Sequence, residues 1–122
     1  MALKALAYSC SGCSSAAQMA NEIAVQLDRK GVVEMSCIAG VGGGAVPLVK
    51  KAKTADVIIG IDGCPLACVK ACLAKEGLKP TIYYELSEMG VKKNAHKSFD
   101  SSEAKSIECL MEQDLKESLE LI

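Results

Sequence analysis

Apolar residues in this chain gather into four short runs, and between the runs they recur at helical spacing. The four runs are predicted strands, and they span residues 3–8, 32–39, 56–61 and 81–86. The third run is apolar almost throughout, which is typical of a central strand covered on both faces. The fourth alternates apolar and polar residues, so we expect it nearer an edge of the sheet, with one face exposed.

Helices are predicted between these strands and after the last one. They span approximately residues 16–30, 46–53, 65–75 and 101–122. Ser14 or Ser15 can cap the first helix, because a hydroxyl accepts a hydrogen bond from a free amide of the first turn. Asp100 stands at the capping position of the last helix. We expect the acidic residues of that helix, Glu108 and Glu112 among them, to face solvent opposite its apolar stripe.

This alternation of strands and helices defines the fold class. Short turns between them require right-handed crossovers, and these give a mostly parallel sheet covered by helices on both faces. We therefore predict one three-layer α/β/α domain over residues 1–122, Rossmann-like, with a four-stranded sheet. The loops that follow the strands then meet at the carboxyl edge of the sheet, where open α/β sheets bind ligands.

Composition narrows the possible partners. The net charge is −1 and only 3% of residues are aromatic, with no Trp, so neither a basic field nor a stacking platform for nucleic acid is present. No apolar run approaches the ~18 residues of a membrane span, and the first residues do not resemble a signal peptide. We expect a cytoplasmic protein with no membrane and no nucleic-acid partner.

Seven cysteines stand out in a chain of 122 residues, which is long enough to fold without disulfides. In a reducing compartment, such a cluster indicates metal or redox chemistry. Cysteines in or beside the first three strand–helix connections are Cys10, Cys13, Cys37, Cys64, Cys68 and Cys72. The seventh, Cys109, lies in the last helix and is interpreted as a packed or idle thiol.

Spacing limits which of these sulfur atoms can share one ion. Cys64 and Cys68 are one helical turn apart and can converge, whereas Cys72 lies ~12 Å from Cys64 along a helix that rises 1.5 Å per residue. Thiolates around one zinc ion lie within roughly 4 Å of one another, so Cys72 is excluded. Cys10 and Cys13 form a C-x2-C loop, and spacing alone would pair them. The amino end of a helix also favours the thiolate form.

One longer string is specific. Residues 61–68 read Ile-Asp-Gly-Cys-Pro-Leu-Ala-Cys, and they follow Cys10-Ser-Gly and a Met-Ser-Cys-Ile-Ala-Gly-Val-Gly-Gly segment at 35–43. Over about residues 5–95 this pattern resembles the DGC-domain family of prokaryotic proteins, named for the tripeptide found here at 62–64. The resemblance implies a four-cysteine zinc site, with Cys10, Cys37, Cys64 and Cys68 as the Zn²⁺ ligands. Cys13 is the reserve ligand.

Other residues near this edge have two interpretations each. Lys92 and Lys93 could offset the −2 charge of a four-thiolate zinc site or lie in a solvated loop, and the solvated loop is favoured. Asp62 is expected to cap the turn before the third helix, or to support Cys64. The glycines at 40–44 favour a tight turn over a phosphate cradle. His96, the only histidine, is expected on the surface.

Three hypotheses about function follow. The first is a zinc-binding protein whose metal is structural or organises a surface for an unknown protein or small ligand. The second is a metal–thiol redox protein or sensor, with Cys13 or Cys68 as the reactive thiol. The third is an iron–sulfur protein that uses the same cysteines. No catalytic constellation and no cofactor motif other than the cysteines is found, so an enzyme activity is not predicted.

Overall fold

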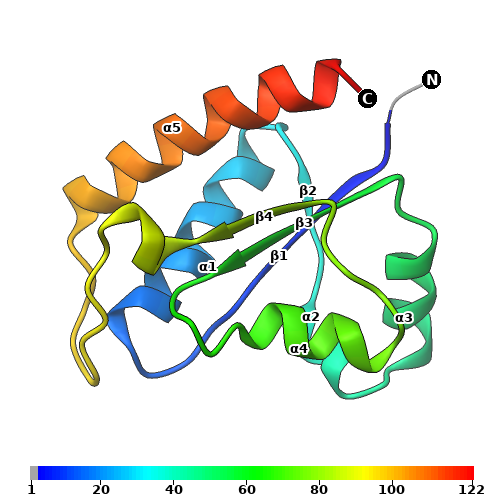
Figure 1. Cartoon of the computed structure of the whole chain (residues 1–122), viewed down its shortest axis with the longest axis horizontal. Helices are drawn as coiled ribbons and strands as arrows, with labels where there is room; N and C mark the ends of the chain where they lie inside the picture. Colours follow the sequence, from blue (N-terminus) through cyan, green and yellow to red (C-terminus); the bar gives the residue numbers. More distant parts are fainter. Residues whose placement is uncertain (1–2) are drawn as a thin grey trace.

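A computed structural model describes residues 3–122 and contains one parallel sheet (Figure 1). Its strands are β1 (Ala5–Ser9), β2 (Glu34–Met35), β3 (Val57–Asp62) and β4 (Ile82–Glu85). They lie side by side in the order β2-β1-β3-β4, and every pairing is parallel. The apolar strand β3 is central and buried and β4 lies at an edge, as the sequence pattern predicted.

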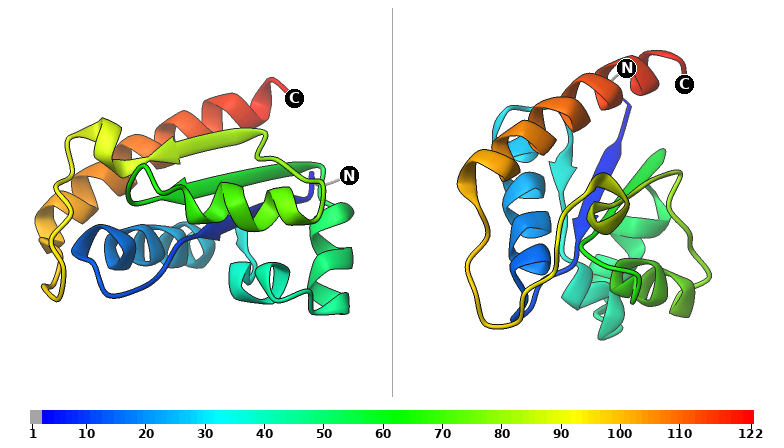
Figure 2. Two further views of the ribbon diagram at one scale, coloured as in Figure 1. Left: turned by 60° about the horizontal axis from the view of Figure 1, so that its bottom comes forward. Right: turned by 60° about the vertical axis from the view of Figure 1, so that its left-hand side comes forward.

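Helices cover both faces of this sheet (Figure 2), so the predicted three-layer α/β architecture is confirmed. They are α1 (Ser15–Arg29), α2 (Ile38–Gly42), α3 (Val46–Lys53), α4 (Cys68–Lys75), the 3-10 helix η1 (Leu86–Met89) and α5 (Ser101–Glu120). Helices α1 and α5 pack together on one face, and α2 packs against α3 and α4 on the other. No helix within residues 3–122 is long and apolar enough to cross a membrane.

Local sequence signals set several helix ends where they were expected. Ser14 caps α1, because its hydroxyl accepts a hydrogen bond from the Ala17 amide at 3.1 Å. Asp100 caps α5 in the same way, through the Glu103 amide at 2.9 Å. Each side chain satisfies an amide that has no partner within its helix.

The glycine-rich stretch after β2 departs from the prediction. The second strand is only two residues long, and residues 38–42 form α2 instead of a tight turn. Close packing explains this helix: a Cβ placed on Gly40 would lie 2.0 Å from Leu48 Cδ1, and one on Gly42 would lie 2.8 Å from Cys72 Sγ. Glycine is a poor helix former, but here its lack of a side chain lets α2 approach α3 and α4.

One further boundary and one exposure also differ. Helix α4 begins at Cys68, later than the predicted Pro65, because the residues before it form an irregular turn. Glu108 on α5 is buried, whereas the prediction placed it in solvent. Its carboxylate lies 2.6 Å from Lys30 Nζ at the end of α1, a long-range ion pair that makes this burial possible.

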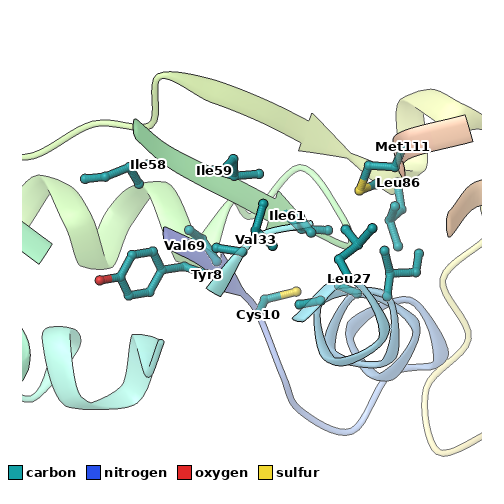
Figure 3. Close-up of a cluster of buried hydrophobic side chains, with 14 of the residues drawn as sticks. Tyr8, Cys10, Leu27, Val33, Ile58, Ile59, Ile61, Val69, Leu86 and Met111 are labelled. Atoms are coloured by element: carbon teal, nitrogen blue, oxygen red, sulfur yellow. The ribbon is translucent and has the colours of Figure 1, made fainter. Parts of the chain in front are cut away.

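The hydrophobic core lies on both sides of β1 and β3. Figure 3 shows part of it, with Tyr8 of β1, Ile61 of β3, Leu27 of α1 and Met111 of α5 among the labelled residues. Cys10 belongs to the same cluster and is only 8% exposed. The carboxyl ends of β1 and β3 therefore rest on a packed core, which holds the loops that follow them.

Candidate functional site

Four cysteines line one pocket at the carboxyl edge of the sheet. The pocket has a volume of about 200 Å³, and Cys10, Cys13, Cys64 and Cys68 all contribute to its wall. Two of them follow β1 and two belong to the connection from β3 to α4. The pocket lies where the loops after parallel strands meet, which is the usual ligand-binding edge of an open α/β sheet.

Cys10 is the most deeply placed of the four. Its amide donates to the Ile61 carbonyl at 3.0 Å, which extends the β1–β3 pairing to the pocket. Its Sγ accepts a hydrogen bond from the Gly63 amide at 3.1 Å. Burial raises the pKa of the Cys10 thiol to about 11, although this hydrogen bond acts in the opposite direction. The Cys10 sulfur therefore carries a proton at neutral pH.

Each residue of the Asp62-Gly63-Cys64 tripeptide has a distinct role in building the pocket. Asp62 is 1% exposed. Its carboxylate accepts hydrogen bonds from the Val69 amide at 2.9 Å and from the Tyr83 hydroxyl. Gly63 passes so close to α1 that a Cβ would lie 2.7 Å from the backbone carbon of Ala16. Cys64 then places its sulfur at the pocket wall. The expectation that Asp62 caps the turn before α4 agrees with this geometry.

Helix α4 begins in a strained conformation. Ala67 precedes its first residue, Cys68, and has a φ of 52°, in the left-handed region that favours glycine. The side chain of Ala67 offers no capping hydrogen bond. The Asp62 carboxylate supplies that function from the end of β3, so the direction of the first turn of α4, and with it the position of Cys68, depends on Asp62.

The 90–99 segment lies alongside the loop after β1 (Figures 1 and 2). The Ser15 amide donates to the Asn94 carbonyl at 2.8 Å, and the Asn94 amide donates to the Ser15 hydroxyl at 3.0 Å. The His96 amide donates to the Cys13 carbonyl at 3.1 Å, and the His96 side chain is exposed, as expected. These bonds fix the segment that carries Lys93 to the pocket.

Lys93 is the basic residue at this pocket. Its Nζ lies 3.5 Å from Cys64 Sγ, and the residue lines the pocket wall. Lys92, its neighbour, does not line this pocket and belongs to a separate polar one. Both lysines are exposed and lie in a loop, as the favoured expectation has it, and Lys93 in addition contacts Cys64. An ammonium group at this position stabilises negative charge on sulfur.

The structure brings three of the four predicted ligands together. Cys10, Cys64 and Cys68 share the pocket with Cys13, the reserve ligand. Cys37 is exposed, does not line this pocket, and caps α2 by accepting a hydrogen bond from the Gly40 amide at 3.3 Å. Cys72 does not line the pocket and packs against Gly42 of α2. Cys109 is exposed on α5. The choice of ligands stays a prediction.

The chemistry of the pocket suits a thiophilic metal ion. Four cysteine residues line one cavity, and a backbone amide and an ammonium group lie close to the sulfurs of two of them, Cys10 and Cys64. Within residues 3–122, however, no three His, Cys, Asp or Glu side chains already stand at positions that could hold a metal ion. The residues present therefore fit zinc by their type, and their side chains would have to converge further to bind it.

Two residues have roles at the pocket that the sequence did not predict, although Gly63 belongs to the tripeptide singled out there. Tyr83 donates its hydroxyl to Asp62 Oδ2 at 2.8 Å, and Gly63 is required by the contact with α1 described above. Tyr83 lies in a strand with ordinary alternation, so its sequence environment carries no sign of this contact. The contact follows from the pairing of Gly60 with Tyr83 across β3 and β4, because Gly60 and Asp62 lie on the same face of β3.

Comparison with known proteins finds matches over most of this chain. The DGC domain family model matches residues 6–112, and the chain therefore belongs to the DGC domain family. A curated relative, the "Anaerobic and virulence modulator AnvM" of Pseudomonas aeruginosa, is 48% identical over 102 residues, which cover 84% of this chain and 78% of the relative. No solved structure matches the chain.

Proposed function

We propose that this protein binds a zinc ion through the thiolates of the cysteine pocket. We further propose that the metal organises the surrounding loops as a surface for a protein or small-ligand partner. The observation that carries this proposal is the shared pocket of Cys10, Cys64 and Cys68, which come from two connections far apart in the chain. A reducing cytoplasm would keep these thiols available for a metal.

Three ligands of the proposed site are Cys10, Cys64 and Cys68, and two residues compete for the fourth position. The family resemblance favours Cys37, whereas the C-x2-C spacing and the pocket wall favour Cys13. Four thiolates would give zinc a closed tetrahedral shell, which is typical of an ion with a structural role. The ammonium group of Lys93 supports the proposal, because such a shell has a net charge of −2.

Serine variants test the proposal and the choice of ligands. We expect protein purified without chelators to contain zinc by elemental analysis, and Cys10→Ser, Cys64→Ser and Cys68→Ser to lose it. Cys13→Ser and Cys37→Ser are compared directly, and the one that loses zinc contributes the fourth ligand. Cys109→Ser, on α5 and exposed, is the matched control and should retain the metal. Less than about half an equivalent of zinc in the unaltered protein would refute the proposal.

A thiol redox switch is a second candidate function. Cys13 is exposed, and it lines the pocket beside Cys10, which is close to it in the chain. Peroxide would oxidise two pocket thiols to a disulfide and be reduced to two molecules of water, and a metal held by those thiols would be released. The name of AnvM describes an anaerobic and virulence modulator, and a response to oxidants in this chain would fit that description.

Two measurements separate the candidates. Free thiols and bound zinc are counted before and after mild peroxide, followed by a thiol reductant. A redox switch requires the loss of two thiols together with the metal, and the recovery of both after reduction. A visible absorption spectrum of protein purified without oxygen tests the iron–sulfur alternative, because a colourless preparation excludes such a cluster.

A further inference from the structure

Asp62 connects the cysteine pocket to the edge strand of the sheet. One oxygen of its buried carboxylate accepts the Val69 amide of α4, and the other accepts the hydroxyl of Tyr83 on β4. Asp62 belongs to the pocket wall and Tyr83 does not. The Tyr83 hydroxyl therefore reaches the pocket wall through this carboxylate.

The Tyr83 side chain contacts α4 at a second point. Lys70 Nζ lies 3.9 Å from the centre of the Tyr83 ring, an arrangement in which the cation is attracted to the face of the ring. Lys70 follows Val69 in the first turns of α4, so one aromatic side chain holds this part of the helix both through Asp62 and directly. Gly60 provides the space, since a Cβ there would lie 3.1 Å from Tyr83 Cδ1.

These contacts act at the start of α4, where the local backbone does little to fix the direction of the helix. The left-handed Ala67 starts α4 without a cap of its own. Asp62 is linked to both cysteines, because it lies two residues before Cys64 in the chain and its carboxylate accepts a hydrogen bond from the turn that begins with Cys68. A carboxylate with only one partner can rotate about its side-chain bonds. A second hydrogen bond, from Tyr83, fixes its orientation.

We propose that Tyr83 is a positioning residue of the cysteine pocket, and that it sets the placement of the Cys64 and Cys68 sulfurs through Asp62. Burial of the phenol and its hydrogen bond to the carboxylate raise the pKa of Tyr83, so the hydroxyl remains a donor throughout the physiological pH range. The consequence for zinc affinity rests on the proposed function, whereas the consequence for thiol reactivity does not.

The neighbouring residue provides a matched control. Tyr84 also lies on β4 and also donates its hydroxyl to an aspartate, Asp114 of α5, but on the opposite face of the sheet. Tyr83→Phe and Tyr84→Phe therefore remove the same group from the same strand, and only the first removes a contact with the pocket. Both variants are compared under conditions in which urea unfolding shows them to be folded.

The first measurement is the rate at which iodoacetamide alkylates each cysteine of the reduced, metal-free protein, resolved by peptide mass spectrometry. We expect Tyr83→Phe to change the rates of Cys64 and Cys68 by about threefold or more relative to Cys109, as the loss of one hydrogen bond would allow. Tyr84→Phe should leave these ratios unchanged. Equal effects of the two variants, or no effect of either, would overturn the proposal.

The second measurement is zinc affinity by competition with a chelator. Tyr83→Phe should weaken binding roughly tenfold, which is common when the support of a metal ligand is removed, and Tyr84→Phe should not. If the unaltered protein binds no zinc, the proposed function fails and the alkylation rates still decide the role of Tyr83. Should Tyr83→Phe not fold, Asp62→Asn tests the same link and must alter the same two cysteines.

Discussion

Gly63 illustrates how a single residue without a side chain can be required by a neighbouring helix. Its amide reaches Cys10 Sγ only because its Cα can approach the backbone of α1, near Ala16. Backbone atoms cannot move aside as the end of a flexible side chain can. Packing against α1 thus explains the glycine of the Asp-Gly-Cys tripeptide. The cysteine that receives its hydrogen bond, Cys10, lies in a different loop.

We predict that Gly63→Ala destabilises the protein and disturbs Cys10. The added methyl group meets backbone atoms at 2.7 Å, and this overpacking should lower the free energy of unfolding by about 1–3 kcal/mol. Urea unfolding measures the loss of stability, and iodoacetamide labelling should show faster alkylation of Cys10, because the displaced turn uncovers its sulfur.

Gly77→Ala is the control for this substitution. A Cβ there meets no atom within 4 Å, and only the positive φ of 74° is unfavourable. Gly77→Ala should therefore lower the stability without changing the rate at which Cys10 is alkylated. If Gly63→Ala left the Cys10 alkylation rate equal to that of the control, the proposed link between Gly63 and Cys10 would be wrong.

Helix α4 shows strain at the scale of one element. Its first turn is held by tertiary contacts, and the left-handed Ala67 before it has a Cβ that is unfavourable in that conformation. We predict that Ala67→Gly raises the free energy of unfolding by about 0.5–1 kcal/mol, since glycine adopts a φ of 52° without this cost. Thermal and urea unfolding test the prediction. Ala71→Gly, in the exposed middle of α4, should instead lower stability by about 1 kcal/mol.

Helices α1 and α5 are joined by charged side chains. Lys30 Nζ contacts Glu108 at 2.6 Å and Glu112 at 2.8 Å, and Lys116 contacts Glu112 at 2.8 Å. Hydrogen bonds from Lys116 and Lys30 lower the pKa of Glu112 from 4.5 to about 2. A carboxyl group whose pKa is lowered by folding stabilises the native state above its unfolded pKa, and this contribution disappears as the pH falls through the folded value.

We therefore predict a loss of stability as the pH falls from 4.5 towards 2. When the pH is lowered across this window, Glu112→Gln should lose less stability than the unaltered protein, because its neutral amide does not bind a proton there. The urea midpoint at each pH measures the effect. Glu117→Gln, on the same helix, is the control and should follow the unaltered protein. Parallel curves for all three proteins would contradict the role assigned to Glu112.

At the scale of the whole molecule, the sequence predicted elements whose signals are local. The apolar run of β3, the caps Ser14 and Asp100, and the helix at 46–53 all depend on neighbouring residues, and the structure confirms them. The topology also followed, because short strand–helix turns permit few arrangements. This topology brings the first three cysteine-bearing connections to the same edge of the sheet.

Features that depend on contacts distant in the chain could not be predicted. Helix α2 forms because its glycines fit against Leu48 and Cys72. Glu108 is buried because Lys30 reaches it from α1, and Tyr83 reaches Asp62 only through the pairing of β3 with β4. Each depends on which surfaces meet, and the periodicity of a single segment does not contain that information.

The bonds that complete the cysteine pocket span long stretches of chain, and this sets an order of events during synthesis. The Gly63 amide and the Cys10 sulfur are separated by 53 residues, and the Asn94 amide and the Ser15 hydroxyl by 79. While the ribosome is still adding the third strand, Cys10 and Cys13 have already been made and have no partners from α4. Such distant contacts form late in folding, because the entropy of closing long loops opposes them, so the wall of this pocket is complete only on a nearly finished chain.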